Sequence, residues 1–238
     1  MTEAAFSNIR LFDGRAALRW RNATIAVAFG LLVTVSACAS DSYNTINGSV
    51  HVVAGRPAEG ASTVNGSVNI DENAAVDSVG TVNGSIHLGA RATAKSLTTV
   101  NGSITVNEGA HTSYVKAVNG DLTINDGAEV SGALTNVNGK IRVHAAHIGG
   151  GIHTEEGDIS ILESTRVDGG ILVEKHSGFT ISVHSGDPTI IIGPGAQVLG
   201  ELRFERKVHL FVSDRATIGS VTGATPITFG GDSPPSAR

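Results

Sequence analysis

Short alternating segments of apolar and polar residues recur along most of the chain. From residue 50 onward, two aliphatic residues repeatedly flank one polar residue, as in Val68-Asn69-Ile70 and Ile104-Thr105-Val106. A period of two places neighbouring side chains on opposite faces of a β-strand. We therefore expect short strands with one buried and one exposed face. Their buried pairs are Val50/Val52, Val68/Ile70, Ile86/Leu88, Ile104/Val106, Leu122/Ile124, Ile141/Val143 and Ile159/Ile161.

An Asn-Gly motif precedes each alternating segment. The motif, Val-Asn-Gly-Ser or a close variant, forms an 18-residue repeat with one step that is longer by one, and decayed copies follow at 155–158 and 176–179. Asn and Gly both tolerate positive φ, which suits a sharp corner between strands. Asparagines in successive copies are expected to form a ladder in which each amide donates to the next. They are Asn47, Asn65, Asn83, Asn101, Asn119 and Asn138.

The repeat predicts an all-β fold, a single-stranded parallel β-helix (β-solenoid) with 18-residue coils, right-handed by expectation. Two further apolar sites lie in each repeat, for example Val76 and Val79. Three short strands per coil bury one continuous core, because each coil alone cannot bury its inner face. Val100, Ile104 and Val106 are predicted to share that core. A two-sheet sandwich is the alternative, but its strand spacing would not be locked to a constant repeat length.

Composition agrees with a narrow aliphatic core. Of the 238 residues, 40% are hydrophobic, 4% aromatic and 16% charged, with 30 glycines and one cysteine. A coiled coil would carry more charge, a disulfide scaffold more cysteine, and a disordered chain less Val, Ile and Leu. The glycines follow no three-residue period, which excludes collagen. The formal net charge of −5 argues against nucleic acid as a partner.

The N-terminal segment has the features of an export signal. Arginines precede an apolar stretch at 23–35, which is too short to span a bilayer comfortably. Val35-Ser36-Ala37-Cys38 resembles the bacterial lipobox. That resemblance implies a signal peptide at 1–37 and a bacterial lipoprotein anchored to the membrane through lipidated Cys38. Because Ala39 and Ser40 follow instead of Asp, it also implies the outer membrane, facing the periplasm. A short transmembrane anchor or a buried cysteine are the alternatives.

The domain organisation follows from these features. We expect a short tether at 38–45, the solenoid at 46–224 with atypical capping coils from about 188, and a flexible tail at 225–238. Terminal repeats are usually atypical because they close the open end. This distal end is also the predicted interaction end, either with a partner or with another copy by end-to-end stacking. Its candidate residues are Arg203, Phe204, Arg206, Lys207 and Phe211.

Two family resemblances cover residues 46 to about 224. The Val-Asn-Gly-Ser repeat with its alternating strand resembles the adhesin repeat domains of bacterial exported proteins. The segment 192–202, with its Gly-Ala-x-Val-x-Gly motif, is similar to bactofilins, polymer-forming proteins built as right-handed β-helices. The resemblances imply architecture more than function. Bactofilins are typically cytosolic scaffolds without a lipobox, a pattern from which this chain departs.

Candidate chemistry is sparse. His144, His147 and His153 form the densest histidine group, but no acidic residue or cysteine adjacent in sequence completes a metal site, so solvated surface histidines are expected. Glu155, Glu156 and Asp158 form an acidic corner, for which a solvated turn is favoured over a weak cation site or a glycosidase pair. The sequence contains no Gly-x-Ser-x-Gly motif and no P-loop. We therefore expect no catalytic, cofactor or metal residues.

Two function classes remain after this search. The favoured hypothesis is a non-enzymatic, envelope-anchored lipoprotein that acts as a structural, adhesive or self-assembling scaffold. The alternative is a carbohydrate-binding or carbohydrate-active β-helix that acts on envelope or extracellular glycan. A glycan enzyme should carry carboxylates and aromatic residues on one exposed face, and aromatic residues are rare in the repeat.

Overall fold

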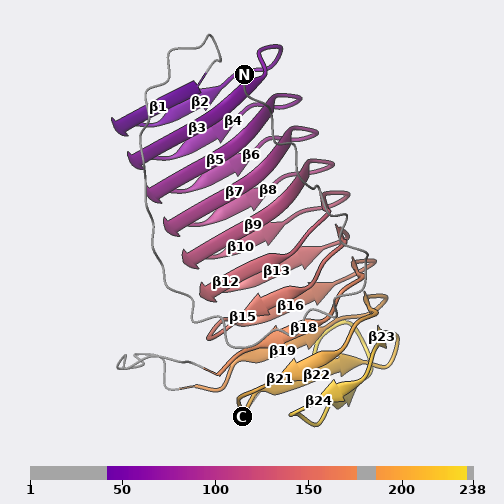
Figure 1. Ribbon diagram of the computed structural model, residues 1–238. Coiled ribbons are helices and arrows are strands. Elements are labelled where there is room, and N and C mark those ends of the chain that lie inside the picture. Colours follow the sequence, from indigo (N-terminus) through magenta and orange to yellow (C-terminus); the bar gives the residue numbers. More distant parts are fainter. Residues whose placement is uncertain (1–41, 176–185, 235–238) are drawn as a thin grey trace, which may run out of the picture. The chain divides into compact units, whose positions relative to one another are not determined.

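The fold is a β-solenoid whose coils stack along one axis. The computed structural model describes residues 42–175 and 186–234, and these ranges contain strands and no helix. By its contacts the chain divides into Met1–Ser36 and Ala37–Arg238, and the solenoid belongs to the second unit. Strand pairs are parallel and lie one coil apart, so the strands follow one another in chain order along the stack (Figure 1). The all-β prediction is confirmed, and parallel pairing excludes the sandwich.

One side of the solenoid is a ten-stranded parallel sheet. Neighbouring strands pair in register, for example Ile86 with Ile104 and Leu88 with Val106. We name each coil by its strand in this sheet. The strands in order are β2 (Val50–Val52), β4 (Val68–Ile70), β6 (Ile86–Leu88), β8 (Ile104–Val106), β10 (Leu122–Ile124), β13 (Ile141–His144), β16 (Ile159–Leu162), β19 (Thr189–Ile192), β22 (His209–Ser213) and β25 (Ile227–Phe229).

The rest of each coil belongs to a 15-stranded sheet. In the first coils one strand supplies this part: β1 (Ser42–Asn47), β3 (Ala58–Asn65), β5 (Ala75–Asn83), β7 (Thr93–Asn101) and β9 (His111–Asn119). In later coils two short strands replace it: β11 (Glu129–Val130) and β12 (Leu134–Asn138), β14 (His147–Ile148) and β15 (Ile152–Thr154), β17 (Arg166–Val167) and β18 (Ile171–Val173), β20 (Gln197–Val198) and β21 (Leu202–Phe204), β23 (Thr217–Ile218) and β24 (Val221–Thr222).

The change from one strand to two coincides with the longer step between Asn119 and Asn138. Val130 pairs with Thr112, at the usual offset, whereas Leu134 pairs with Val115, at an offset that is longer by one. The extra residue therefore lies in the segment 131–133, between β11 and β12. An added residue cannot continue the register of a parallel pair, so the strand is interrupted there.

The distal coils depart further from the constant repeat length. Ile159 pairs with Ile190, far beyond the offset of the earlier coils, so the coil between them contains an insertion. The decayed motif predicted at 176–179 lies within this insertion and outside the described residues. At the end of the chain, Ile227–Phe229 form β25 and pair with β22. The prediction of a flexible tail from residue 225 is therefore wrong for these residues, because Phe229 is only 6% exposed and extends the sheet by one strand.

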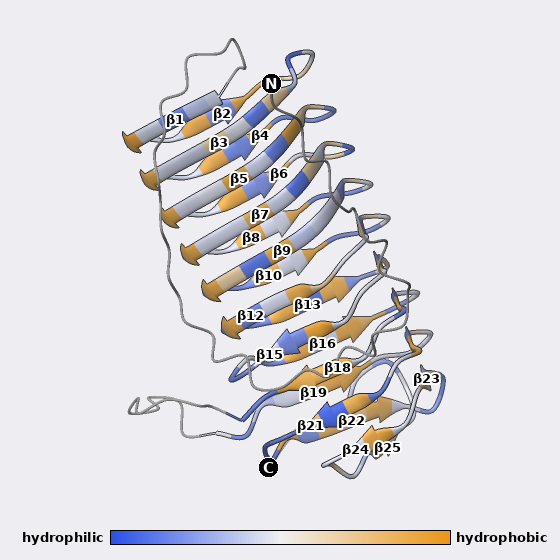
Figure 2. Cartoon of the chain, viewed as in Figure 1, coloured by the Kyte–Doolittle hydropathy of each residue, from blue (hydrophilic) through white to orange (hydrophobic). Residues whose placement is uncertain are grey.

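The core is the shared aliphatic interior that the alternation predicts. The inward residues of β2 to β16 are buried, and the residues between them are half-buried or exposed, as the banded colouring of the strands illustrates (Figure 2). Ile104 and Val106 are fully buried. The prediction for Val100 is wrong: it is half-buried, and Thr99 takes the inward position. Counted from buried Leu97, the alternation points Thr99 inward, and the Thr99 hydroxyl donates to Gly84 O at 3.0 Å.

Candidate functional site

The Asn-Gly corner is stabilised by a continuous row of side-chain hydrogen bonds. Asn65 Nδ2 donates to Asn47 Oδ1 at 3.0 Å, and the same contact repeats at 3.0 Å through Asn83, Asn101, Asn119 and Asn138. Asn65, Asn83, Asn101 and Asn119 each donate to the preceding coil and accept from the following one, whereas Asn47 only accepts and Asn138 only donates. The row ends where Glu156 occupies the equivalent position. Stacked amide rows of this kind stabilise parallel in-register strands.

The corner glycines allow backbone to stack directly on backbone. A Cβ on Gly102 would lie 2.0 Å from the carbonyl oxygen of Gly84, and one on Gly84 would lie 1.9 Å from that of Gly66. Gly102 also has a φ of 155°, which disfavours other residues. The motif therefore requires glycine for close approach between coils as well as for the turn.

Buried threonines and the residue after each glycine add two more rows of bonds between coils. The hydroxyls of Thr63, Thr81 and Thr99 donate to glycine carbonyls of the preceding coil at 2.9–3.0 Å. Backbone N–H groups donate to the side chain one coil earlier, as from Lys140 N to Asp121 Oδ1 at 2.8 Å. Burial raises the pKa of Asp121, but hydrogen bonds from Lys140 N–H and the Arg142 guanidinium outweigh it and leave this pKa below its ordinary value. Polar groups at the corner thus hold neighbouring coils together.

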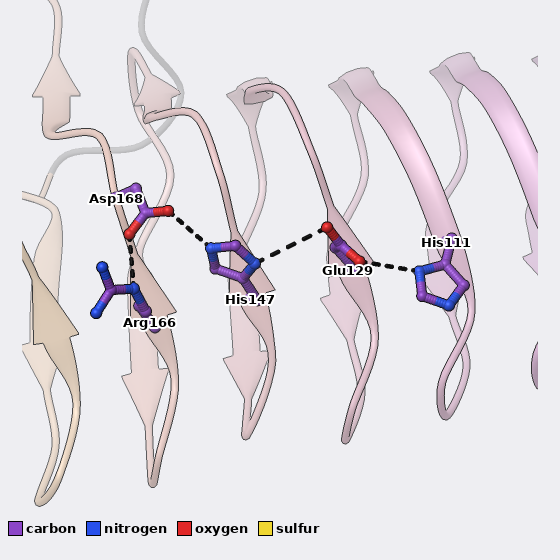
Figure 3. Close-up of polar contacts among 5 residues, drawn as sticks. All are labelled: His111, Glu129, His147, Arg166 and Asp168. Carbon is purple, nitrogen blue, oxygen red and sulfur yellow. Dashed lines mark hydrogen bonds and ion pairs between the residues drawn. The ribbon is translucent and has the colours of Figure 1, made fainter.

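A row of histidines and carboxylates crosses β9, β11, β14 and β17 of the 15-stranded sheet (Figure 3). His111 Nδ1 lies 3.1 Å from Glu129 Oε2, and His147 Nδ1 lies 4.0 Å from Glu129 Oε1. On its other side, His147 Nε2 lies 2.8 Å from Asp168 Oδ2, and Arg166 Nε lies 2.7 Å from Asp168 Oδ1. Hydrogen bonds from His147 and then Arg166 lower the pKa of Asp168. The row joins four successive coils, those of β8, β10, β13 and β16.

His144 makes a second bridge between coils. It is the last residue of β13, three residues before His147. Its Nδ1 lies 2.5 Å from Asp126 Oδ1 in the coil of β10, and its Nε2 lies 2.9 Å from Glu163 Oε1 in the coil of β16. The hydrogen bond with Asp126 is the main cause of a raised pKa for His144, and the charge of Glu163 adds to it. Beside Asp126, a shallow hollow of about 490 Å³ is lined by Ala90, Asn107, Glu108, Asn125 and Asp126.

His144 and His147 are surface side chains, 40% and 41% exposed, but each contacts acidic residues that the sequence interpretation does not identify. Acidic partners come from neighbouring coils, which sequence proximity does not show. For His144, however, the two carboxylates contact opposite ring nitrogens, so they do not converge on one point. Within 42–175 and 186–234, no group of three or more histidine, cysteine or acidic residues could hold a metal ion. His153 belongs to a different column, in which it pairs with Thr135 and Leu172.

The acidic corner is a bridged site, not the solvated turn that we expect from sequence. Arg206 Nη1 donates to Glu155 O at 3.1 Å and lies 3.8 Å from Glu156 Oε1. Asp158 accepts a hydrogen bond from Thr189 N at 2.9 Å and lies 3.6 Å from Lys140 Nζ. Arg206 therefore contacts a corner that lies two coils earlier in the stack.

The predicted interaction end is less accessible than the sequence suggests. Phe204 and Phe211 are each only 5% exposed, so neither is an exposed docking residue, and that prediction is wrong for both. Phe204 is the inward residue at the end of β21 and belongs to the core. Among the predicted charges, Arg203 pairs with Glu205 at 2.8 Å and Lys207 with Asp187 at 3.0 Å. Among residues 186–234, Leu199 and Ile227 are the exposed large apolar residues, at 44% and 47% exposure.

Several contacts have only a weak signal in the sequence. Asn125 Nδ2 donates to Asn107 Oδ1 at 3.2 Å, which makes a second asparagine pair that the sequence interpretation missed. Aligning the chain on itself at the repeat length, or at the longer step, would place His144 beside Asp126 and Glu163, and His147 beside Glu129. It would not place Arg206 beside Glu155, because the insertion changes the offset to 51 residues.

The predicted anchor lies outside the described part of the chain. Cys38 and the signal segment at 1–37 precede Ser42, where β1 begins. In the described ranges there is no helix with the length and apolar character needed to cross a membrane. No family model, curated protein or solved structure matches this chain.

Both ends of the solenoid leave strand edges without a partner strand among the described residues. β2 and β25 are the terminal strands of the ten-stranded sheet, and β1, β23 and β24 end the other sheet. The N–H and C=O groups on such an edge are a template for pairing with another strand. Because the strands are parallel, the two ends differ, and a contact between them would be head-to-tail.

Proposed function

We propose that this protein is a non-enzymatic scaffold of the bacterial cell envelope, anchored by lipidated Cys38 and able to associate end to end. The observation that carries this proposal is that, among residues 42–175 and 186–234, both ends of one continuous stack present parallel strand edges without a partner strand. A second copy can continue both sheets without any new type of contact. A heterologous contact of this kind generates an open filament when its rotation does not close.

The use of the polar residues supports a structural role. Amides, hydroxyls and charged groups on the corners form bonds from coil to coil, as in the asparagine row and the His144 bridge. Such bonds make a rigid support. The lipobox resemblance of Val35–Cys38 supports the anchor, since two or more acyl chains give stable membrane attachment.

Cysteine crosslinking of full-length protein in detergent tests the association. In a head-to-tail contact that continues the ten-stranded sheet, Ile227 of one copy meets the outward column that begins with His51 of the next. Within one chain these positions are nine strand steps apart, roughly 43 Å, whereas a disulfide needs Cα atoms within about 7 Å. The variant carrying both His51→Cys and Ile227→Cys should therefore form covalent trimers and longer species on oxidation. If it forms only the species given by either single variant, end-to-end association is wrong.

Metabolic labelling with a palmitate analogue tests the anchor separately. Wild-type protein should be labelled and recovered with membranes. The Cys38→Ala variant should be unlabelled and released. Continued labelling and membrane attachment of Cys38→Ala would refute lipidation at this residue without bearing on the crosslinking result.

Glycan binding is a second candidate because one aromatic side chain lies exposed on a flat sheet face. Tyr114 is 62% exposed, and its ring lies against Gly132, where an added Cβ would come within 2.7 Å of Cε1. Its column continues with Ser96, Ser78 and Gly60, which leave the face unobstructed. Tyr114→Ala should abolish co-sedimentation with insoluble cell-wall glycan if this ring stacks on a sugar. Equal co-sedimentation of wild type and variant would exclude Tyr114 as the binding residue.

A further inference from the structure

His144 is placed so that its two ring nitrogens contact carboxylates of two different coils. Asp126 lies in the coil before it and Glu163 in the coil after it, at 2.5 and 2.9 Å. A carboxylate only accepts hydrogen bonds, and a neutral imidazole carries a single N–H. Both contacts can be hydrogen bonds only when the ring carries two protons. In the neutral ring, one nitrogen presents a lone pair to a carboxylate.

We propose that His144 is a proton-dependent clamp that joins the coils of β10, β13 and β16, so that the middle of the solenoid is more stable under mildly acidic than under alkaline conditions. This device is independent of anchoring and association. It acts at coils where the asparagine row ends, since Asn138 is the last member. In the coils before it, the asparagine and threonine rows at the corner use amides and hydroxyls, which do not change charge between mildly acidic and mildly alkaline pH.

The charges around the clamp favour the protonated ring. Asp126 and Glu163 face it from the two adjacent coils, and Glu108 lines the same hollow as Asp126. On the other side of residues 145–146, the row of His111, Glu129, His147, Asp168 and Arg166 alternates between basic and acidic residue types. On the strand of His144 itself, Arg142 is paired with Asp121 at 2.9 Å. Acidic groups are therefore the immediate neighbours of the ring.

The sign of the pH dependence follows from the raised pKa of His144. A group with a higher pKa in the folded state contributes stability that is complete below its unfolded pKa, about 6.5 for histidine. This contribution is lost as the pH rises through the folded pKa. Asp168, whose pKa is lowered, contributes above the ordinary carboxylate pKa and loses its contribution only in stronger acid. Between the ordinary carboxylate pKa and the raised pKa of His144, the His144 ring and the Asp168 carboxylate are both charged.

Hydrogen exchange of full-length protein at pH 6 and pH 8.5, corrected for intrinsic exchange rates, tests the clamp. Amides in residues 122–167 of the wild type should lose protection by about three- to tenfold more than those in 76–106 on going to pH 8.5. This reference range excludes Asp71, which lies 2.5 Å from His51 and could respond to pH in the same way. His144→Gln should lack this difference. His87→Gln is the matched control, because His87 is exposed and no described acidic residue lies within ion-pair distance of it, and it should behave as the wild type.

Direct titration of His144 by NMR separates the clamp from a general effect of pH on the solenoid. The resonance of His144 should titrate above 6.5, and this midpoint should fall in both Asp126→Asn and Glu163→Gln. If His144 titrates at or below 6.5, or if His144→Gln keeps the wild-type pH dependence of exchange, the clamp does not exist.

Discussion

Replacement of Gly102 by alanine should destabilise the solenoid strongly, because this change tests backbone stacking at the corner. The added Cβ would lie 2.0 Å from Gly84 O and 2.5 Å from Gly84 C. Since Cβ atoms essentially never come within 3.0 Å of such atoms, the two coils must separate by about 1 Å at this point. The φ of 155° adds backbone strain for alanine.

The cost can be estimated from the bonds that this separation stretches. Gly84 N donates to Asn101 O at 2.9 Å, the Thr99 hydroxyl donates to Gly84 O at 3.0 Å, and Asn101 Nδ2 donates to Asn83 Oδ1 at 3.0 Å. At about 1 kcal/mol net for each bond, their loss amounts to about 3 kcal/mol. Holding alanine at a φ of 155° adds about 1–3 kcal/mol.

Gly80 provides the control within the same chain. An added Cβ there has Thr98 O, at 3.9 Å, as its nearest neighbour, and its φ is not positive. Gly80→Ala should therefore be neutral or stabilising by about 0.5–1 kcal/mol, because alanine restricts the unfolded chain. Denaturant unfolding of both variants, followed by circular dichroism, measures the difference. Equal stabilities for Gly102→Ala and Gly80→Ala would refute backbone stacking as the reason why glycine recurs at the corner.

Two further comparisons test the contacts between coils. Asn101→Ala removes one donated and one accepted bond and should cost about 1–2 kcal/mol, whereas Asn47→Ala, at the end of the row, removes one and should cost about half as much by denaturant unfolding. A result in which the two variants are equally stable would contradict a continuous row. Arg206→Met should increase hydrogen exchange in the distal coils because Arg206 holds the acidic corner, whereas exposed Arg203→Met should not. Identical exchange in both variants would contradict this role.

The sequence predicts the coil well because one period controls both the strands and the corners. The spacing of the asparagines identifies the columns of residues, and alternation from Val50 to Ile161 identifies the inward side chains of the ten-stranded sheet. The prediction that Val100 faces the core fails because it counts the inward positions backward from the Asn-Gly motif. Buried Leu97 sets the phase of the alternation, and Thr99 can be buried because its hydroxyl is bonded.

Predictions for the distal coils and the surface are less successful for two physical reasons. The insertion after β18 removes the constant offset, so the contact between Arg206 and Glu155 cannot be found from the repeat. Phe211 occupies an outward position in β22 yet is 5% exposed, which alternation alone does not reveal. His144 and its carboxylates come from three coils, so the site exists only once the coils are stacked in register.

Two adjacent aspartate substitutions test the central claim of a shared interior most directly. Ile104 is fully buried, whereas Thr105 is half-buried on the outer face between His87 and Thr123. Ile104→Asp places an unpaired charge in the core and should cost at least about 3 kcal/mol of unfolding free energy. Thr105→Asp introduces the same charge on the surface and should change it by less than about 0.5 kcal/mol. A large loss for Ile104→Asp alone is the predicted result of denaturant unfolding, and equal losses for the two variants would contradict the solenoid core.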